Sequence, residues 1–123
     1  MSKRKTFKRL QETMAVQHPK RTWIAAQITD RAQFMKSLDA GLEYIDRHPR
    51  LAYTGILETW RPMLHPELSI DQQAAALYIG TKRHRMEAVV VGDVSEFAED
   101  EELRDTYIDT LQSAGVEIIE IGK

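Results

Sequence analysis

"AVVVGDVSEFAEDEELRDTYIDTLQSAGVEIIEI", residues 88–121, is the stretch that decides the fold. It begins with an apolar, β-branched run, the composition of a parallel strand covered on both faces. An amphipathic helical pattern follows over residues 97–114, and Gly115 is placed to end it as a left-handed cap. The apolar run at residues 116–121 completes a strand–helix–strand unit, whose strands we expect to be parallel and whose crossover we expect to be right-handed.

Further elements are predicted on the amino-terminal side of this unit. The compact apolar run TWIAAQI, residues 22–28, predicts a first buried strand. Apolar side chains recur on one helical face over residues 31–47, which predicts a helix. Residues 50–60 combine helical apolar spacing with poor helix formers such as Gly55, and we expect a helix there as well.

Residues 70–80 are open to two interpretations. Ser69 and Gln72 match a capping box ahead of an alanine-rich run, which predicts a helix that ends at Gly80. The rival is a hairpin across residues 74–91, because apolar runs flank the polar loop TKRHR at residues 81–85. The alanine run favours the helix.

These patterns together predict a small α/β domain of two or three layers over residues 22–123. Its sheet is short and mainly parallel, with three strands at about 22–28, 87–91 and 116–121. Its helices are expected at about 31–47, 50–60, 70–80 and 97–114. Residues 1–21 are expected to form a basic N-terminal helix or arm, with a linker at 17–21.

Composition narrows the class of protein. A chain of 123 residues fits one domain, and its lack of cysteine removes disulfides, zinc–thiolate sites and thiol nucleophiles. No run approaches the roughly 18 apolar residues of a membrane span, and the N-terminus lacks the apolar stretch of a secretory signal. We therefore expect a cytoplasmic protein with no membrane contact.

Charge is distributed unevenly along the chain. The net charge is only −2, yet residues 1–50 carry eleven Lys and Arg against five acids, whereas residues 51–123 carry six against fourteen. Ten cations form the predicted binding surface for nucleic acid or an acidic protein surface. They are Lys3, Arg4, Lys5, Lys8, Arg9, Lys20 and Arg21 in the N-terminal segment, and Lys82, Arg83 and Arg85 in the TKRHR loop.

Two aspartates raise an enzymatic alternative. Asp30 and Asp93 each follow a predicted strand, and the carboxyl ends of parallel strands meet at the edge where α/β sheets bind ligands. A carboxylate pair there could hold Mg²⁺ for phosphoester chemistry. Helix capping is the commoner role for such residues, and we favour it. The spacing of the histidines matches no metal signature, and no nucleotide-loop motif is present.

Three functions are therefore ranked. The leading hypothesis is a small non-enzymatic accessory or regulatory binding domain without a cofactor, which contacts nucleic acid or an acidic protein surface through its basic arm. The second is a Mg²⁺-dependent phosphoesterase or nuclease-like enzyme that uses Asp30 and Asp93, with the TKRHR loop holding phosphate. The third is a structural homo-oligomer, in which the basic end of one subunit meets the acidic helix of the next.

Overall fold

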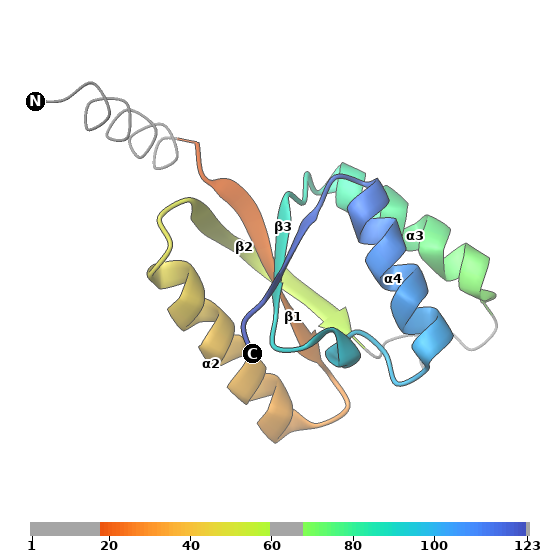
Figure 1. Ribbon diagram of the computed structural model, residues 1–123, viewed down its shortest axis with the longest axis horizontal. Helices are drawn as coiled ribbons and strands as arrows, with labels where there is room; N and C mark the ends of the chain where they lie inside the picture. The colour runs from red at the N-terminus through yellow and green to blue at the C-terminus, as the bar shows by residue number, and fades with distance from the viewer. Residues whose placement is uncertain (1–17, 60–67, 123) are drawn as a thin grey trace, which may run out of the picture.

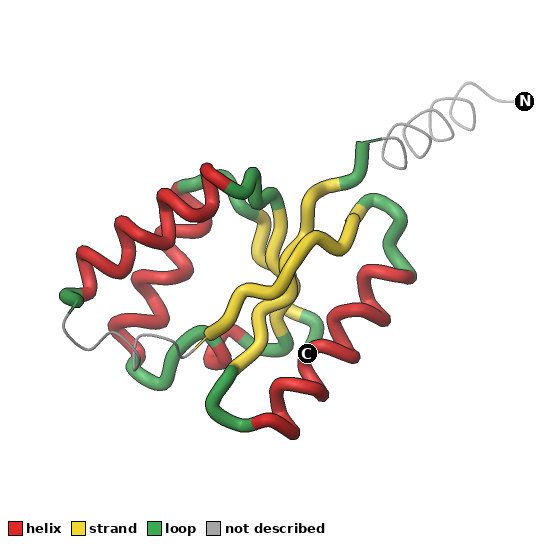
Figure 2. Tube along the Cα trace, turned by 180° about the vertical axis from the view of Figure 1, so that it is seen from behind, coloured by secondary structure: helices red, strands yellow, loops and turns green. Residues whose placement is uncertain are grey.

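Four parallel strands form the centre of the computed structural model, which describes residues 18–59 and 68–122 (Figure 1). The strands are β1 (Lys20–Gln27), β2 (Leu51–Thr59), β3 (Ala88–Val91) and β4 (Glu117–Glu120), in the order β2-β1-β3-β4. Helix α2 (Arg31–Asp46) lies on one face of the sheet, and α3 (Ile70–Arg83) and α4 (Glu101–Ser113) lie on the other (Figure 2). The predicted α/β class with a parallel sheet is confirmed, with four strands where three were expected.

The additional strand is β2, and the helix predicted at residues 50–60 is wrong. The segment pairs with β1 along its whole length, from Lys20 opposite Leu51 to Gln27 opposite Thr59. Its Tyr, Thr and Ile side chains favour an extended backbone, and pairing with β1 satisfies the backbone groups that a helix would have satisfied internally. Tertiary pairing therefore outweighs the helical spacing of its apolar residues.

A one-residue irregularity in β2 explains why its apolar pattern misleads. Thr22 faces Tyr53 and Trp23 faces Gly55, which leaves Thr54 as an extra residue. Such an insertion reverses the alternation of side chains beyond it. Leu51 accordingly packs in the core on the α2 side, and Leu57 packs against the core on the α3 and α4 side.

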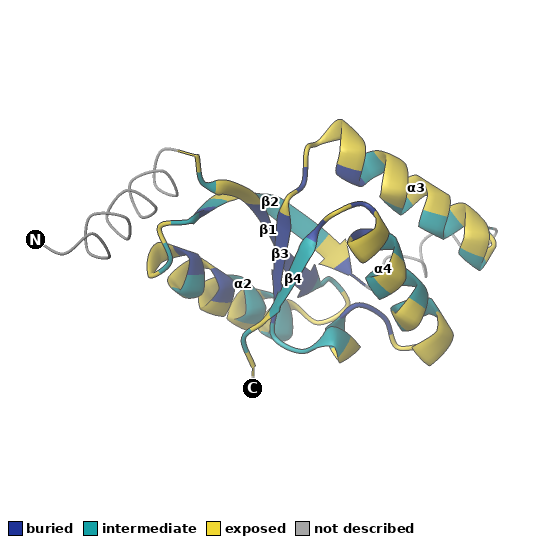
Figure 3. Cartoon of the chain, turned by 45° about the horizontal axis from the view of Figure 1, so that its top comes forward, coloured by how far each residue is buried: buried dark blue, intermediate teal, exposed yellow. Residues whose placement is uncertain are grey.

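The strand predicted at residues 87–91 is interior, as its composition indicates. All four residues of β3 are buried (Figure 3). Successive residues of the strand belong alternately to the two core clusters. Val89 and Val91 pack toward α4, and Val90 packs toward α2 with Ile24 and Ile45. Each face of the sheet therefore has its own apolar layer under a helix.

Helix ends agree closely with the sequence signals, with two corrections. The capping box of α3 is present, with Ser69 Oγ accepting from the Gln72 amide at 3.1 Å. The helix then continues past Gly80 to Arg83, so the rival hairpin is wrong. At the end of α4, Gly115 has a φ of +82°, and the amide of Val116 bonds to the Leu111 carbonyl as in a Schellman motif. The helix predicted at 97–114 instead begins at Glu101, after a short 3₁₀ turn, η2 (Val94–Glu96).

Chain direction gives the sheet two chemically different edges. Because each helix runs antiparallel to the strands it connects, helix C-termini lie at the amino ends of the strands and helix N-termini at the carboxyl ends. The connection from β1 leads outward to β2 and the next returns past β1 to β3, so the sheet reverses its winding between β1 and β3. The carboxyl ends of β1 and β3 thus form the topological switch point at which open α/β sheets commonly bind ligands.

Candidate functional site

Cationic side chains from three separate segments meet at the amino ends of the strands. We call this surface the basic edge, and its members are Lys20, Arg21, Arg50, Lys82, Arg83 and Arg85. The Arg21 guanidinium donates to the carbonyl of His84, with Nη2 3.3 Å from the oxygen. In the backbone, the amide of Glu87 donates to the carbonyl of Arg21 at 3.0 Å. The N-terminal cations Lys20 and Arg21 are thereby placed beside the loop at residues 81–85, although some 60 residues separate them in the sequence.

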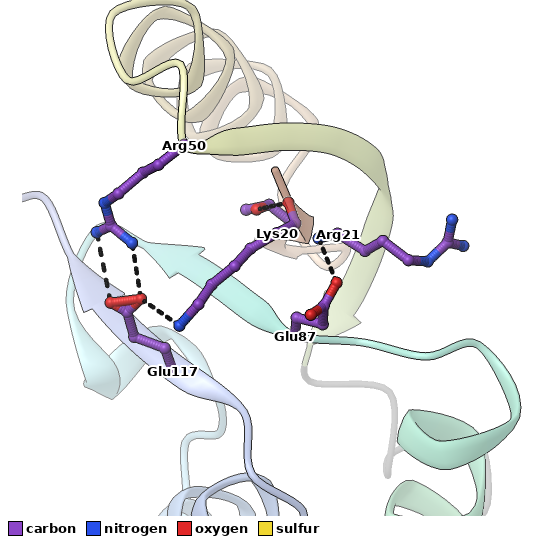
Figure 4. A network of polar contacts seen from close by, with 6 residues as sticks. Lys20, Arg21, Arg50, Glu87 and Glu117 are labelled. Atoms are coloured by element: carbon purple, nitrogen blue, oxygen red, sulfur yellow. Dashed lines mark hydrogen bonds and ion pairs between the residues drawn. The ribbon is translucent and has the colours of Figure 1, made fainter. Parts of the chain in front are cut away.

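Part of the basic edge is neutralised by one carboxylate. Glu117, the first residue of β4, pairs with Arg50 at 2.9 Å and with Lys20 at 3.3 Å (Figure 4). The hydrogen bond from Arg50 lowers the pKa of Glu117 below its ordinary value, burial opposes this shift, and Lys20 reinforces it. Arg50 directly precedes β2 and Glu117 begins β4, so this ion pair connects the two outer strands across the amino end of the sheet.

The remaining cations of the basic edge have no carboxylate partner among the described residues. Arg21 bonds to a neutral carbonyl, and Figure 4 shows its side chain directed away from Glu117. Lys82 donates to the carbonyl of Ala114 at 3.0 Å. Arg83 and Arg85 are exposed and make no side-chain hydrogen bond or ion pair within the described ranges. Four cationic side chains therefore face solvent without an ion pair, although the exposed Glu87 carboxylate lies among them and accepts from the Arg21 backbone amide at 3.0 Å (Figure 4).

The predicted aspartates lie at the opposite edge, where each caps a helical turn. Asp30 is the N-cap of α2 and accepts from the Gln33 amide at 3.1 Å. Asp93 is the N-cap of η2 and accepts from the Ser95 amide at 2.9 Å. Since they follow the neighbouring strands β1 and β3, they share the switch-point edge, as the parallel sheet requires. Each carboxylate thus has the capping function that the sequence favoured.

A side-chain contact that the sequence did not indicate joins the two sides of the switch point. Gln33 Nε2, in the first turn of α2, donates to Glu96 Oε1 in η2 at 3.2 Å. The other carboxylate oxygen of Glu96 is buried without a hydrogen-bond partner. No group of three or more His, Asp or Glu side chains within residues 18–59 and 68–122 is arranged to hold a metal ion.

The residues that the enzymatic alternative requires lie at opposite ends of β3. The TKRHR loop precedes β3 and Asp93 follows it, so the loop cations and the carboxylates lie at opposite ends of that strand. A single site cannot use both the loop as a phosphate clamp and the aspartates as metal ligands. The sequence order alone did not reveal this separation, because it depends on the position of β3 between them.

An apolar hollow of about 650 Å³ opens between β2 and α3. Its floor includes Trp23, Gly55 and Leu57, and α3 supplies Leu77 and Gly80. The Trp23 ring lies so close to Gly55 that a Cβ at this position would come within 2.6 Å of the Nε1 atom of the indole. Glycine at this position therefore allows the indole to form the floor of the hollow.

The hollow reaches the basic edge at one end. Thr81 and His84 belong to its lining, and the Arg21 guanidinium that bonds to His84 lies 5.6 Å from the centre of the Trp23 ring. Trp23 is 9% exposed and packs in the core, as expected for the buried strand predicted at residues 22–28, whereas no pattern in the sequence indicates this opening. Among the described residues, α3 packs chiefly against α4, which leaves the hollow between α3 and β2, and no local sequence signal indicates this packing.

Most of the basic helix or arm predicted at residues 1–21 lies outside the described residues, including its cations Lys3, Arg4, Lys5, Lys8 and Arg9. The described chain begins at His18, two residues before the basic edge, and β1 starts at Lys20 where the linker was expected to continue. The N-terminal segment therefore joins the domain at the same edge as the TKRHR loop.

Comparison with known proteins gives no family assignment. No family model, curated protein sequence or solved structure was found to match the chain. Among the described residues, no helix is both long and apolar enough to cross a bilayer.

Proposed function

We propose that this protein is a small accessory or regulatory binding domain that contacts nucleic acid through its basic edge and N-terminal segment. The observation that supports this most strongly is the convergence of Arg21 with the TKRHR loop. Two cationic segments far apart in the sequence lie next to each other and face outward together. Lys20 and Arg21 lie at this edge, and five further cations precede them in the sequence. Phosphates are the natural partners of such a surface, and the resulting affinity should depend steeply on salt.

A salt titration with charge-neutralised variants tests the proposal. Arg83→Gln combined with Arg85→Gln removes two exposed cations that make no hydrogen bond or ion pair in the described chain. Each lost phosphate contact should reduce the slope of log affinity against log salt by about 0.7 for single strands and 0.9 for duplex. We therefore expect the double variant to bind a fluorescein-labelled oligonucleotide with a slope about 1.4 to 1.8 less steep.

The matched control removes two cations elsewhere. Arg31 and Lys36 are exposed on α2, away from the basic edge, and replacing both with Gln changes the net charge by the same amount. This control should retain the wild-type slope. Equal slopes for all three proteins would contradict the proposal. Deletion of residues 2–9, which removes five cations, should abolish binding, and an unchanged titration would exclude the N-terminal segment.

An acidic protein surface is the alternative partner of the same edge. Asp71, Asp93 and the acids at 99–102 lie at the carboxyl ends of the strands, so the described domain is basic at one edge and acidic at the other. Two copies of this domain could then associate head to tail. Measurement of mass in solution at low and high salt distinguishes this outcome, since an assembly held by exposed charges loosens as they are screened.

A second candidate function is retained for the switch-point edge. Asp30 and Asp93 follow neighbouring parallel strands at the position where many α/β proteins bind ligands, and this placement favours a Mg²⁺ site. The phosphate clamp expected from the TKRHR loop would have to come from other residues. Under this alternative, Asp93→Asn should eliminate a Mg²⁺-dependent phosphoester hydrolysis measured with a generic phosphodiester substrate.

A further inference from the structure

The hollow between β2 and α3 combines three properties that match one class of ligand. It is largely apolar, it is lined by the aromatic residues Trp23, which is 9% exposed, and Tyr107, and one end opens onto cations. Its volume of about 650 Å³ is within the usual range for small-molecule sites, roughly 300–1,000 Å³. A ligand that fits both the apolar interior and the cationic end of the hollow must carry a flat apolar group joined to a negative charge.

Two polar side chains, Gln73 and Tyr107, line the hollow among its apolar walls. Gln73 lines the hollow, and its Oε1 is buried without a hydrogen-bond partner, while its Nε2 donates to the Leu68 carbonyl at 3.1 Å. The Tyr107 hydroxyl is protonated at neutral pH and can donate, and burial raises its pKa further above its ordinary value. Both side chains have hydrogen-bonding groups of the kind that pair with the edge of a nucleobase.

The charges around the hollow set the direction in which the ligand enters. Arg21 lies over Trp23 at the end lined by His84, and Lys82 and Arg83 follow in the last turn of α3. The acidic residue in the lining, Glu58, is near the carboxyl end of β2, at the other end of the strand. An anionic backbone is therefore attracted to the Arg21 end, with its apolar group directed along the floor.

We propose that the hollow accepts an unpaired nucleobase from a single-stranded nucleic acid whose phosphates contact the basic edge. This inference rests on the proposed function, and it specifies the form of nucleic acid. In a duplex the bases are stacked and paired, so they cannot enter the hollow, whereas an unpaired base can stack on an aromatic side chain. The protein consequently binds single strands more tightly than duplexes at the same salt concentration.

Gly80 provides a variant that fills the hollow without disturbing the fold. It lies within α3 and lines the hollow, and a Cβ at this position would meet no atom within 4 Å. Gly80→Leu introduces a branched side chain into open space at a helix position that favours leucine over glycine. Gly80→Ala is the matched control, because it gives the helix a similar benefit and leaves most of the space empty. Ala76→Leu, one turn earlier on the same lining, is a second filling variant.

Fluorescence anisotropy with labelled dT20 and a 20-base-pair duplex tests the inference. Wild type and Gly80→Ala should bind dT20 more tightly than the duplex. Gly80→Leu should weaken dT20 binding about tenfold, the effect of losing about one stacked base, and leave duplex binding and the salt slope unchanged. Quenching of Trp23 fluorescence by dT20, measured in a Trp60→Phe background, should disappear in Gly80→Leu.

The outcomes separate this inference from the function on which it rests. If dT20 and duplex bind equally, and Arg83→Gln with Arg85→Gln weakens both while neither filling variant has any effect, the basic edge is correct and the base site is wrong. If neither nucleic acid binds with a salt-dependent affinity, the proposed function itself fails. Quenching of Trp23 by an acidic amphipathic peptide in place of dT20 would overturn the inference in favour of a protein ligand.

Discussion

Two glycines in different helices should respond in opposite ways to the same substitution. Gly41 lies in α2 and Gly80 in α3, and an alanine at an ordinary helix position stabilises a protein by about 0.8–1 kcal/mol relative to glycine. At Gly80 the new methyl group meets no atom within 4 Å. Gly80→Ala should therefore stabilise the protein by about the full 1 kcal/mol.

At Gly41 the same methyl group would overlap Ile24. The Cβ would lie 2.7 to 2.9 Å from three carbon atoms of that side chain, about 1 Å closer than the usual 3.5–4.0 Å carbon contact. Ile24 is only 1% exposed, in the strand β1 beneath α2, and has little room to move. Overpacking of this kind costs about 1–3 kcal/mol, so Gly41→Ala should be less stable than Gly80→Ala by about that amount.

Urea denaturation monitored by circular dichroism measures the difference in the free energy of unfolding, and thermal denaturation measures the difference in Tm. In a chain of 123 residues, each kcal/mol corresponds to about 4 °C in Tm, so the two variants should differ by roughly 4 to 12 °C. Ile24→Val removes one of the three overlapping atoms, and the double variant with Gly41→Ala should cost less than the sum of the single changes. Equal stabilisation by both alanines would refute the packing of α2 against β1.

Two further predictions concern the edges of the sheet. Glu117→Gln should destabilise the protein by about 0.5–1 kcal/mol at neutral pH, a small effect because the paired side chains are partly exposed. Because Arg50 lowers the pKa of Glu117 in the folded protein, this stabilisation is complete above the ordinary value and is lost as the pH falls through the lowered one. Urea titrations of both proteins should therefore converge in acid, and a constant difference would contradict the ion pair. Asp30→Ala should cost about 1 kcal/mol as a lost N-cap while Asp30→Asn stays near wild type, whereas equal losses would point to a role for the charge.

Local signals were sufficient for most of the elements of the fold. The buried run at residues 88–91, the capping box at Ser69 and the left-handed Gly115 each depend on residues within a few positions of one another. Such features are readable because the physical cause lies in the sequence neighbourhood. The parallel arrangement then placed Asp30 and Asp93 at one edge without further information.

Features that depend on pairing between distant segments could not be predicted. The sequence of β2 predicts a helix because its extra residue, Thr54, disrupts the two-residue alternation that identifies a strand. The contact between Arg50 and Glu117 joins positions 67 residues apart. The hollow likewise depends on the packing of α3 against α4. The individual cations can be identified in the sequence. That Arg21 contacts the TKRHR loop could not be predicted, because it depends on the pairing of β1 with β3.

Chemical-shift mapping with ¹⁵N-labelled protein tests the central claim most directly, because it locates the surface that contacts nucleic acid. On addition of a short oligonucleotide, we expect the largest amide shifts at residues 20–23 and 80–87, diminishing as salt is added. Residues 92–104, at the opposite edge, should change little. Shifts concentrated around Asp30 and Gly92–Phe97, with the basic edge unaffected, would contradict the account and move the functional site to the switch point.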